Sequence, residues 1–341
     1  HTFHISKEER RNKKMKTIRR IIFACITIWV LAVTVAPKYD KQINAIFEKV
    51  LGPYHHEDKD VNTEELSTWN DTENDITPAP KNSLEVTFID GGQGDSILIE
   101  DAGKTMLIDT GYWDAYDTLK QTFSDKGIER IDALVLTHPD ADHIGAAEDI
   151  ITHYQVGMIY TSVADSDSKT YQYVQDAIEL YNVPVNYPQA GDTMQLGNAV
   201  YEWLGPVNDV DDTNSMSLVL KVVNGNDSFL FTGDMTGKEM KDITGDMSAD
   251  VLKAAHHGSA NEGCNSSELF DRVKPEYAVI SCGKGNRYGH PHKETMQEIK
   301  ERGIKCFRTD EQGTISCTST GNGIVWSVEP TTDYHNGSSE K

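Results

Sequence analysis

The most informative part of the sequence is Leu134-Val135-Leu136-Thr137-His138-Pro139-Asp140-Ala141-Asp142-His143-Ile144-Gly145. It opens with an apolar run that predicts a buried strand, and the strand leads directly into His138, Asp140, Asp142 and His143. Because these residues lie on a short turn before an expected helix, their side chains can converge on one or two cations. Imidazole nitrogen combined with carboxylate oxygen suits Zn²⁺, Mn²⁺ or iron. A polar loop that caps a helix is the alternative for this stretch alone.

Two further apolar strands end in residues of the same kind. Leu230–Phe231 is followed by Thr232-Gly233-Asp234, and Val251–Ala255 is followed by His256-His257-Gly258-Ser259. Ligand sites in α/β folds usually lie where the carboxyl ends of strands meet at one sheet edge. Three strands with such endings therefore predict a single metal site along one edge.

The folded domain is expected to span residues 83–329. Short strands are predicted at 84–89, 96–100, 105–108, 133–137, 156–161, 217–223, 228–231, 250–255, 277–281 and 324–328, and helices at 115–124, 144–153, 170–180, 266–273 and 293–301. Hairpins at the start, followed by alternating strands and helices, predict an α/β (α+β) sandwich of mixed sheets with helices outside.

The chain is acidic as a whole, but its first residues are basic. It has 32 Lys and Arg against 54 Asp and Glu, a formal net charge of -22. A basic segment (1–20) precedes an apolar run (21–36), which predicts a transmembrane signal anchor with the amino terminus in the cytoplasm and the domain outside. The run is short for a membrane span, so a cleaved export signal is the alternative. Pro37 after Ala36 disfavours cleavage there.

The segments that flank the domain are expected to have no packed core. Residues 37–82 are interpreted as a juxtamembrane segment, with a short helix at 38–51, followed by an acidic linker at 53–82, which has no apolar period and cannot bury enough surface to fold. Residues 330–341 are expected to be a disordered tail. The location that follows is a single-pass membrane protein with an extracellular carboxyl-terminal domain, or a secreted protein if the segment is cleaved.

Five cysteines are present, and Cys25 lies in the apolar run. In an exported domain the other four would meet an oxidising space. Cys306 and Cys317 flank an apparent hairpin that turns near 311–313, which makes a cross-strand disulfide plausible and leaves Cys264 with Cys282. Four ordinary buried thiols are the alternative.

At this level of detail the chain resembles the metallo-β-lactamase fold, an αβ/βα sandwich. It is most similar to the carboxyl-terminal hydrolase domain of ComEC-type DNA-uptake proteins. The resemblance covers about 83–328 and rests on seven stretches: Phe88–Ser96, Leu107–Gly111, Thr137–Gly145, Asn214–Leu220, Thr232–Asp234, His256–Ser259 and Asn286–Pro291. It is specific for fold and metal and less specific for substrate.

The resemblance implies two divalent metal ions, Zn or Mn, and a role for each motif. His138, Asp140, Asp142 and His143 would be ligands and Asp234 would bridge the two metals. His256 is the preferred terminal ligand because it follows the strand directly, which leaves His257 to support the site or donate a proton. Asp109 and Asp95 would support the ligand loops. Asp140 stands where many relatives carry His, which favours Mn²⁺, and the further His that many relatives place before Gly-Asp has no clear equivalent.

The chemistry implied is hydrolysis of a phosphodiester by water that two cations activate, so no nucleophilic Ser or Cys is needed. The residues expected to act in catalysis are Asp142, His257 and His290. Substrate binding is assigned to Lys284, Arg287, His290 and Asn214, of which the first three belong to a basic loop in an acidic domain. A solvated Gly-rich loop with incidental charge is the alternative for Lys284, Arg287 and His290.

The leading substrate is DNA or fragments of nucleic acid. The acidic balance argues against tight non-specific binding of duplexes, which depends on many Lys and Arg contacts to phosphate. A phosphodiester of the cell wall, such as phosphocholine on teichoic acid, is the alternative, and a non-catalytic binding module stabilised by metal is a third reading. The expected partners are the phosphodiester substrate, the membrane through the anchor, and the DNA-uptake machinery; the oligomeric state is left open.

Overall fold

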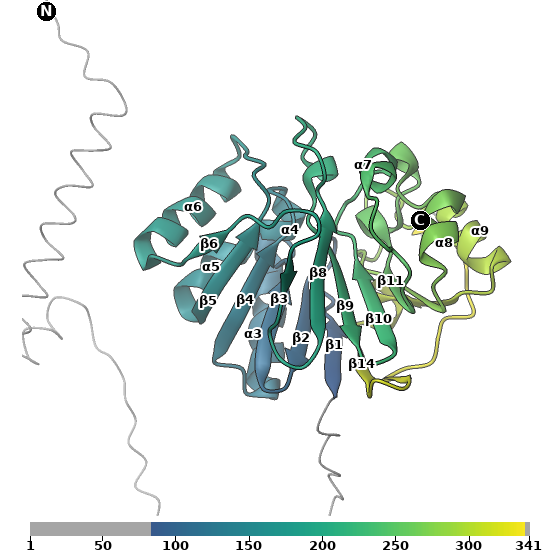
Figure 1. The fold of residues 1–341 in the computed structure, drawn as a ribbon, viewed down its shortest axis with the longest axis horizontal. Helices are drawn as coiled ribbons and strands as arrows, with labels where there is room; N and C mark the ends of the chain where they lie inside the picture. The colour runs from purple at the N-terminus through teal and green to yellow at the C-terminus, as the bar shows by residue number, and fades with distance from the viewer. Residues whose placement is uncertain (1–82, 338–341) are drawn as a thin grey trace, which may run out of the picture. The chain divides into compact units, whose positions relative to one another are not determined.

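The computed structural model describes residues 83–337, which form two β-sheets packed face to face with helices on both outer sides (Figure 1). The first sheet has eight strands in the order β15-β14-β1-β2-β3-β4-β5-β6. Its strands are β1 (Leu84–Phe88), β2 (Ile97–Asp101), β3 (Lys104–Ile108), β4 (Arg130–Leu136), β5 (Gln155–Thr161), β6 (Val185–Asn186), β14 (Ile315–Ser319) and β15 (Ile324–Trp326).

The second sheet has seven strands in the order β13-β12-β11-β10-β9-β8-β7. They are β7 (Thr193–Met194), β8 (Val200–Gly205), β9 (Val219–Asn224), β10 (Asp227–Phe231), β11 (Val251–Lys253), β12 (Tyr277–Ile280) and β13 (Lys305–Arg308). Strands β3 to β6 are parallel, and so are β10 to β13. Parallel strands end at a common edge, so each sheet presents a row of carboxyl ends from which loops extend.

Side chains alternate along the strands between an inner core and two outer cores, as the period of two in a strand requires. In β4, Ala133 and Val135 face the core between the sheets, whereas Leu134 and Leu136 face the outer side. In β10, Phe229 and Phe231 enter the inner core, while Leu230 faces the outer side. This explains why the strands read as continuous apolar runs, because both of their faces are buried.

The helices fall into two groups, one on each outer face (Figure 1). The first sheet is covered by α3 (Tyr116–Lys126), α4 (Ala141–Ile144), α5 (Ala147–His153) and α6 (Lys169–Tyr181), and the second by α7 (Gly237–Asp242), α8 (Ser267–Val273) and α9 (Lys293–Glu301). A single-turn helix, α10 (Thr309–Gln312), links β13 to β14. The predicted two-sheet sandwich with outer helices is therefore confirmed.

The predicted hairpin around 311–313 is wrong. The strands that carry Cys306 and Cys317 belong to different sheets, and α10 passes the chain from one sheet to the other. Cys306 packs in the outer core of the second sheet and Cys317 in the inner core. Cys264, Cys282, Cys306 and Cys317 are all buried free thiols, as in the alternative stated for them, and no disulfide joins them within the described residues.

The end of the domain also differs from the prediction. Residues 330–337 were expected to belong to a disordered tail, but they fold back onto the second sheet. Thr331 N donates to Cys306 O at 2.8 Å, and Gly337 N donates to Pro291 O at 3.0 Å. The expected anchor and linker lie within 1–82, outside the described residues. Within 83–337, no helix has the length and apolarity needed to cross a bilayer.

One buried carboxyl group lies on α7, outside the predicted site. Glu239 is 2% exposed, and its Oε1 accepts a hydrogen bond from Val207 N at 2.9 Å. Burial raises the pKa of Glu239 from 4.5 to about 7, and the nearby Asp242 adds to this effect. The folded protein therefore holds a proton on Glu239 that the unfolded chain releases at lower pH.

Replacing Glu239 with Gln should change how stability depends on pH. Between pH 4.5 and about 7 the folded state binds more protons at this group, so its contribution to stability is present at low pH and is lost as pH rises. We therefore expect the difference in the midpoint of thermal unfolding, Glu239→Gln minus wild type, to be more positive at pH 8 than at pH 5. Glu148→Gln, at an exposed position on α5, is the matched control. If Glu239→Gln and wild type differ in unfolding midpoint by the same amount at both pH values, the raised pKa of Glu239 does not contribute to the pH dependence of stability.

Candidate metal centre

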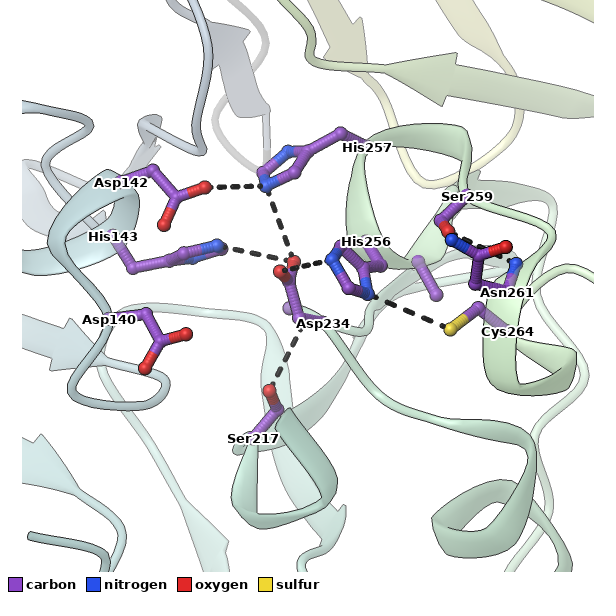
Figure 2. A network of polar contacts seen from close by, with 12 residues as sticks. Asp140, Asp142, His143, Ser217, Asp234, His256, His257, Ser259, Asn261 and Cys264 are labelled. Carbon is purple, nitrogen blue, oxygen red and sulfur yellow. Dashed lines mark hydrogen bonds and ion pairs between the residues drawn. The ribbon is translucent and has the colours of Figure 1, made fainter. Parts of the chain in front are cut away.

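Three strand ends deliver the predicted ligands to one place (Figure 2). After β4, Thr137 and His138 lead into α4, which carries Asp142 and His143, with Asp140 as its N-cap. After β10, a Thr-Gly turn presents Asp234, and after β11 a short turn presents His256 and His257. The first group comes from one sheet and the second from the other, so the site lies where the two sheets meet at their edge.

The carboxylate of Asp234 lies at the centre of the cluster. Its Oδ1 is 3.2 Å from His143 Nε2 and 3.5 Å from His257 Nε2. Its Oδ2 is 3.9 Å from His138 Nε2 and 3.5 Å from His256 Nε2. Each oxygen thus faces a different pair of imidazoles, which is the arrangement expected of a carboxylate shared by two cations.

The remaining predicted carboxylates complete these two sets. Asp142 Oδ2 lies 3.4 Å from His257 Nε2, on the Oδ1 side of Asp234. Asp140 Oδ2 lies 3.9 Å from His138 Nε2, and Thr213 Oγ1 donates to the other oxygen of Asp140 at 3.1 Å. Hard oxygen and imidazole nitrogen therefore occur together in both sets, as divalent first-row metals prefer.

Hydrogen bonding indicates that the cluster fits cations. The Nε2 atoms of His138, His143 and His257 and the Oδ1 atom of Asp234 are buried, and none has a hydrogen-bond partner among residues 83–337. Buried polar atoms are normally paired, because an unpaired one loses its hydration without compensation. The ligand atoms of His138, His143 and Asp234 lie within 4.8 Å of one another, as do those of Asp142, His143 and His257. Divalent metal ions, which the fold implies, would satisfy all of these atoms.

The other ring nitrogen of each imidazole is held by a hydrogen bond. His143 Nδ1 lies 2.7 Å from Asp109 Oδ2, and His257 Nδ1 lies 3.0 Å from the carbonyl oxygen of Ser281. His138 Nδ1 lies 3.1 Å from Thr137 Oγ1 and 3.3 Å from Ser217 Oγ. Such contacts fix the ring orientation and leave Nε2 free for a metal.

Asp109 ties the ligand loop to the first sheet. Its two carboxylate oxygens accept from Thr137 N at 2.8 Å and Thr137 Oγ1 at 2.7 Å, in addition to the contact with His143. Thr110 N and its hydroxyl donate to His143 O. The loop between β4 and α4 is therefore fixed from beneath by the end of β3.

A fully buried ion pair supports the opposite side of the cluster. Lys253 Nζ is 2.8 Å from Asp95 Oδ2, and Asp95 Oδ1 is 3.5 Å from His257 Nδ1. Burial would raise the pKa of Asp95, but Lys253 and His257 outweigh this effect and hold it at about 2. Breaking such a pair leaves a buried charge without a partner, which typically costs about 3–5 kcal/mol.

The backbone is strained where the two adjacent histidines are presented. His256 and His257 have φ values of 49° and 56°, in the left-handed region that residues other than Gly rarely adopt. Gly94 has a φ of 123°, and a Cβ on it would lie 2.1 Å from Asp142 O. The β1–β2 loop can therefore lie against the ligand loop only with Gly at this position. Such strain at a cluster of polar groups is typical of functional sites.

The electrostatics of the cluster are dominated by its carboxylates. Burial by itself would lower the pKa of His257, but Asp234, Asp142 and Asp95 raise it to about 10. His138 has a pKa lowered to about 4, first by burial and then by His143. Asp234 has a pKa well below its usual range, since His143 and His257 outweigh the effect of burial. The cluster is thus strongly attractive to cations, and their uptake would displace protons.

Most of the predicted site residues come together, but the two adjacent histidines differ from expectation. We expected His256 to be the terminal ligand, whereas His257 is 1% exposed and lies between Asp142 and Asp234. His256 is partly exposed, and its Nδ1 faces Cys264 Sγ at 3.9 Å (Figure 2). The turn directs His257 into the buried centre of the cluster. The order of the two histidines in the sequence does not reveal which of them is the more buried.

The residues predicted to bind substrate are spread around the cluster. His290 is buried, with its ring 5.6 Å from that of His256 and 6.2 Å from that of His257. Lys284 and Arg287 are exposed on the same loop. Asn214 begins a short 3₁₀ helix, and its Oδ1 is buried with no hydrogen-bond partner in the described part of the chain.

Sequence reasoning missed three residues that build the site. Thr137 and Ser217 hold His138, and Ser217 Oγ also accepts from Asp234 N at 3.1 Å. Lys253 pairs with Asp95. The signal for Lys253 was present, since it is a lone cation in an apolar strand, whereas small hydroxyl residues give no such signal.

Two facing sheets, with helices outside and an Asp and His cluster at their common edge, define the αβ/βα sandwich class of metal-binding folds. A sequence profile of the Metallo-beta-lactamase superfamily matches residues 89–282, more than half of the chain. The chain therefore belongs to the metallo-beta-lactamase superfamily. The family resemblance inferred from the motifs is confirmed.

The chain is also similar to individual proteins. The chain is 34% identical over 282 residues to ComE operon protein 3 of Bacillus subtilis, covering 76% of this chain and 36% of that protein. It is 32% identical over 243 residues to Competence protein ComA of Neisseria gonorrhoeae, covering 69% of this chain and 32% of that protein. The chain thus spans about a third of the length of these relatives. Among solved structures, the metallo-beta-lactamase fold protein YhfI from Bacillus subtilis aligns with a TM-score of 0.44 at 14% identity, covering 64% of this chain and 93% of that one.

The geometry predicts different consequences for the two adjacent histidines. His257→Ala should lose about one equivalent of bound Mn²⁺ or Zn²⁺ per chain, because it removes a buried imidazole between two carboxylates. His256→Ala should retain more metal, because its ring is partly exposed. Elemental analysis of the dialysed full chain, with circular dichroism as a check of folding, measures both. Equal or greater loss in His256→Ala would restore the assignment made from the sequence.

Proposed function

We propose that this chain is a metal-dependent phosphodiesterase that acts on nucleic acid. The observation that carries the proposal is the convergence of unpaired imidazole Nε2 atoms from two sheets on the two oxygens of Asp234. No serine or cysteine is positioned as a nucleophile in this cluster, as far as residues 83–337 show; the thiol of Cys264 is buried, and burial raises its pKa to about 12.

The donor set assigns residues to two positions. His143, His257, Asp142 and Oδ1 of Asp234 would hold one cation, and His138, Asp140 and Oδ2 of Asp234 would hold the other, with His256 at its side. When bound, two such cations polarise a phosphoryl oxygen and lower the pKa of a coordinated water. The mixture of carboxylate and imidazole is compatible with both Mn²⁺ and Zn²⁺.

His290 is the residue placed to act on the substrate itself. Burial, together with the charge of His257, lowers the pKa of His290 to about 3, so its ring is neutral at physiological pH. Its Nδ1 is buried and has no hydrogen-bond partner within the described range. A neutral imidazole can donate a hydrogen bond to a phosphoryl oxygen or to a leaving group.

Nucleic acid is favoured over a wall phosphodiester by the similarity to Competence protein ComA, whose name refers to competence. The net charge of -22 disfavours tight binding to duplexes, so short or single-stranded substrates fit this chain better. Lys284 and Arg287 supply exposed cations on the loop that ends at His290, where they would contact the phosphates that flank the cleaved bond.

We also propose that the domain acts outside the cell membrane, held there by residues 21–36, and that the DNA-uptake machinery is its partner. The support is the change from a basic segment to an apolar run and then to an acidic domain. The four free thiols do not decide between compartments, because all of them are buried.

Removing the imidazole of His290 should separate catalysis from metal binding. His290→Ala should lower kcat for bis-p-nitrophenyl phosphate about 100-fold, the usual effect of losing a hydrogen-bond donor to the transition state, while bound metal stays at the wild-type level. His153→Ala, on the exposed surface of α5, is the control for substitution of a histidine. Parallel loss of metal and activity in His290→Ala would show a structural role instead.

The proposed activity is tested with the full chain in the presence of Mn²⁺ or Zn²⁺, beside Asp234→Ala. We expect hydrolysis of both bis-p-nitrophenyl phosphate and linear DNA, and loss of both in the variant, because Asp234 faces every imidazole in the cluster. Cleavage of the small ester and of a phosphocholine ester, with DNA left intact, would favour the wall polymer. Metal retained with no turnover on any of these would favour a binding module.

A further inference from the structure

A pocket of about 470 Å³ lies beside the metal centre, between the loop that follows β3 and the loop that follows β12. The residues that line it and matter here are Gln93, Tyr112, Trp113, Asn286, Arg287 and Tyr288. Its volume is within the range of sites that hold small planar ligands.

The walls of this pocket are aromatic and unusually exposed. Trp113 is 73% exposed and Tyr288 is 42% exposed, although both are large side chains that normally bury most of their surface. The guanidinium of Arg287 lies over the ring of Tyr288 at 4.8 Å from its centroid, and its Nη2 donates to the Tyr288 hydroxyl at 2.7 Å. The pocket therefore combines flat aromatic faces with a cation.

The wall formed by residues 283–290 is held in shape by Asn286. The backbone nitrogens of Tyr288 and His290 both donate to Asn286 Oδ1, at 3.1 and 3.0 Å. Asn286 Nδ2 donates in turn to Gly283 O and His290 O. A loop fixed in this way presents its aromatic ring without further loss of entropy when a ligand binds.

Gln93 joins the two sides of the pocket. Its Oε1 accepts from Gly283 N at 3.1 Å, while its Nε2 has no hydrogen-bond partner among the residues described. The loop between β1 and β2 is thereby tied to the loop after β12, and one amide donor is left unsatisfied in the pocket wall.

The pocket is continuous with the metal centre. The ring of Tyr288 is stacked on that of His290, with centroids 5.6 Å apart and planes 20° apart, and His290 contacts the rings of His256 and His257. On the other side, Tyr112 lines the pocket together with Tyr288, and the residue before it, Gly111, accepts a hydrogen bond at 2.8 Å from Gly145 N, close to the ligand His143. A group bound in the pocket would therefore lie next to a phosphodiester held at the metals.

We propose that Trp113, Tyr288 and Arg287 form a subsite that stacks an unpaired base of single-stranded nucleic acid next to the phosphodiester to be cleaved, an inference that rests on the proposed function. Every base has a π-face, so stacking on aromatic rings and guanidinium accepts any sequence. A base that is paired within a duplex cannot enter, which selects single strands. Arg287 adds attraction for the backbone phosphates.

Aromatic rings also bind quaternary ammonium groups, as a phosphocholine ester would require. The position of Arg287 argues against that occupant, because its guanidinium already covers one ring face and repels a second cation. Asp114 also lines the pocket and would attract a cation, but the guanidinium of Arg287 still occupies the face of the Tyr288 ring. The observations therefore favour a base over choline.

The experiment compares oligothymidylate with an oligomer of the same length that carries only abasic sugars, using the full chain. Values of kcat/KM are measured with Mn²⁺, and dissociation constants of fluorescein-labelled oligomers are measured by anisotropy in EDTA. For oligothymidylate, Trp113→Ala should lower both kcat/KM and binding affinity about tenfold, and the change in kcat/KM should come mainly from KM. For the abasic oligomer, the same substitution should change kcat/KM and affinity less than twofold. Because Trp113 is exposed, the substitution should not unfold the chain.

Two further variants sharpen the test. Tyr173→Ala removes an exposed aromatic side chain from α6, away from the pocket, and should leave both oligomers unaffected. Tyr288→Phe keeps the stacking ring and should retain most of the preference for bases, whereas Tyr288→Leu should lose it.

Each outcome decides between the two proposals. Equal kcat/KM for the two oligomers, or an equal loss on both in Trp113→Ala, would overturn the subsite while leaving the phosphodiesterase intact. If neither oligomer is cleaved, the proposed function fails, but the dissociation constants still test the subsite. Equal dissociation constants for the two oligomers, or no binding of either, would overturn the subsite. A loss in Trp113→Ala that is confined to a phosphocholine ester would assign the pocket to choline instead.

Discussion

The buried carboxylate of Asp234 is the constraint on which the rest of the structure depends. It stands where the two sheets meet. Its Oδ1 faces the imidazoles of His143 and His257, and its Oδ2 faces those of His138 and His256. A buried charge is tolerated only when opposite charges or hydrogen bonds surround it. The loops after β4, β10 and β11 are therefore held within a few ångströms of one another, and the sandwich keeps its two sheets in register at this edge.

Much of the surrounding structure compensates for this concentration of charge. Asp109 fixes His143, Ser281 fixes His257, and the Lys253–Asp95 pair lies fully buried behind them. The left-handed backbone at His256 and His257 is a further cost. These features contribute little to stability by themselves, since buried ion pairs gain about as much as they lose in solvation. They are better explained as a means of orienting ligand atoms, which need fixed directions to bind cations.

The surface beside the metals has a different character from the metal cluster itself. The cluster is rich in carboxylates, whereas the adjoining loop offers Arg287 and aromatic faces at Trp113 and Tyr288. In a chain with a net charge of -22, a local cation next to a metal centre gives an anionic strand one favourable place to approach. Affinity for the phosphate backbone and affinity for bases are thus supplied by neighbouring but chemically distinct groups.

The sequence alone is enough to predict the two-sheet sandwich and to locate the three strand ends that carry His and Asp residues. Buried strands give continuous apolar runs, and the switch to His, Asp and Gly at their ends is a local signal that survives in one dimension. The tertiary fold decided that both His256 and His257 face Asp234 and that His257 is the more deeply buried of the two, because a left-handed backbone turn sets the direction of each side chain. It also decided that Cys306 and Cys317 lie in different sheets, and that residues 330–337 pack on the domain, since strand pairing depends on contacts between distant segments. The pocket of Trp113 and Tyr288 belongs to the same class of features, because two loops about 175 residues apart in sequence (113 to 288) come together only when both sheets have formed.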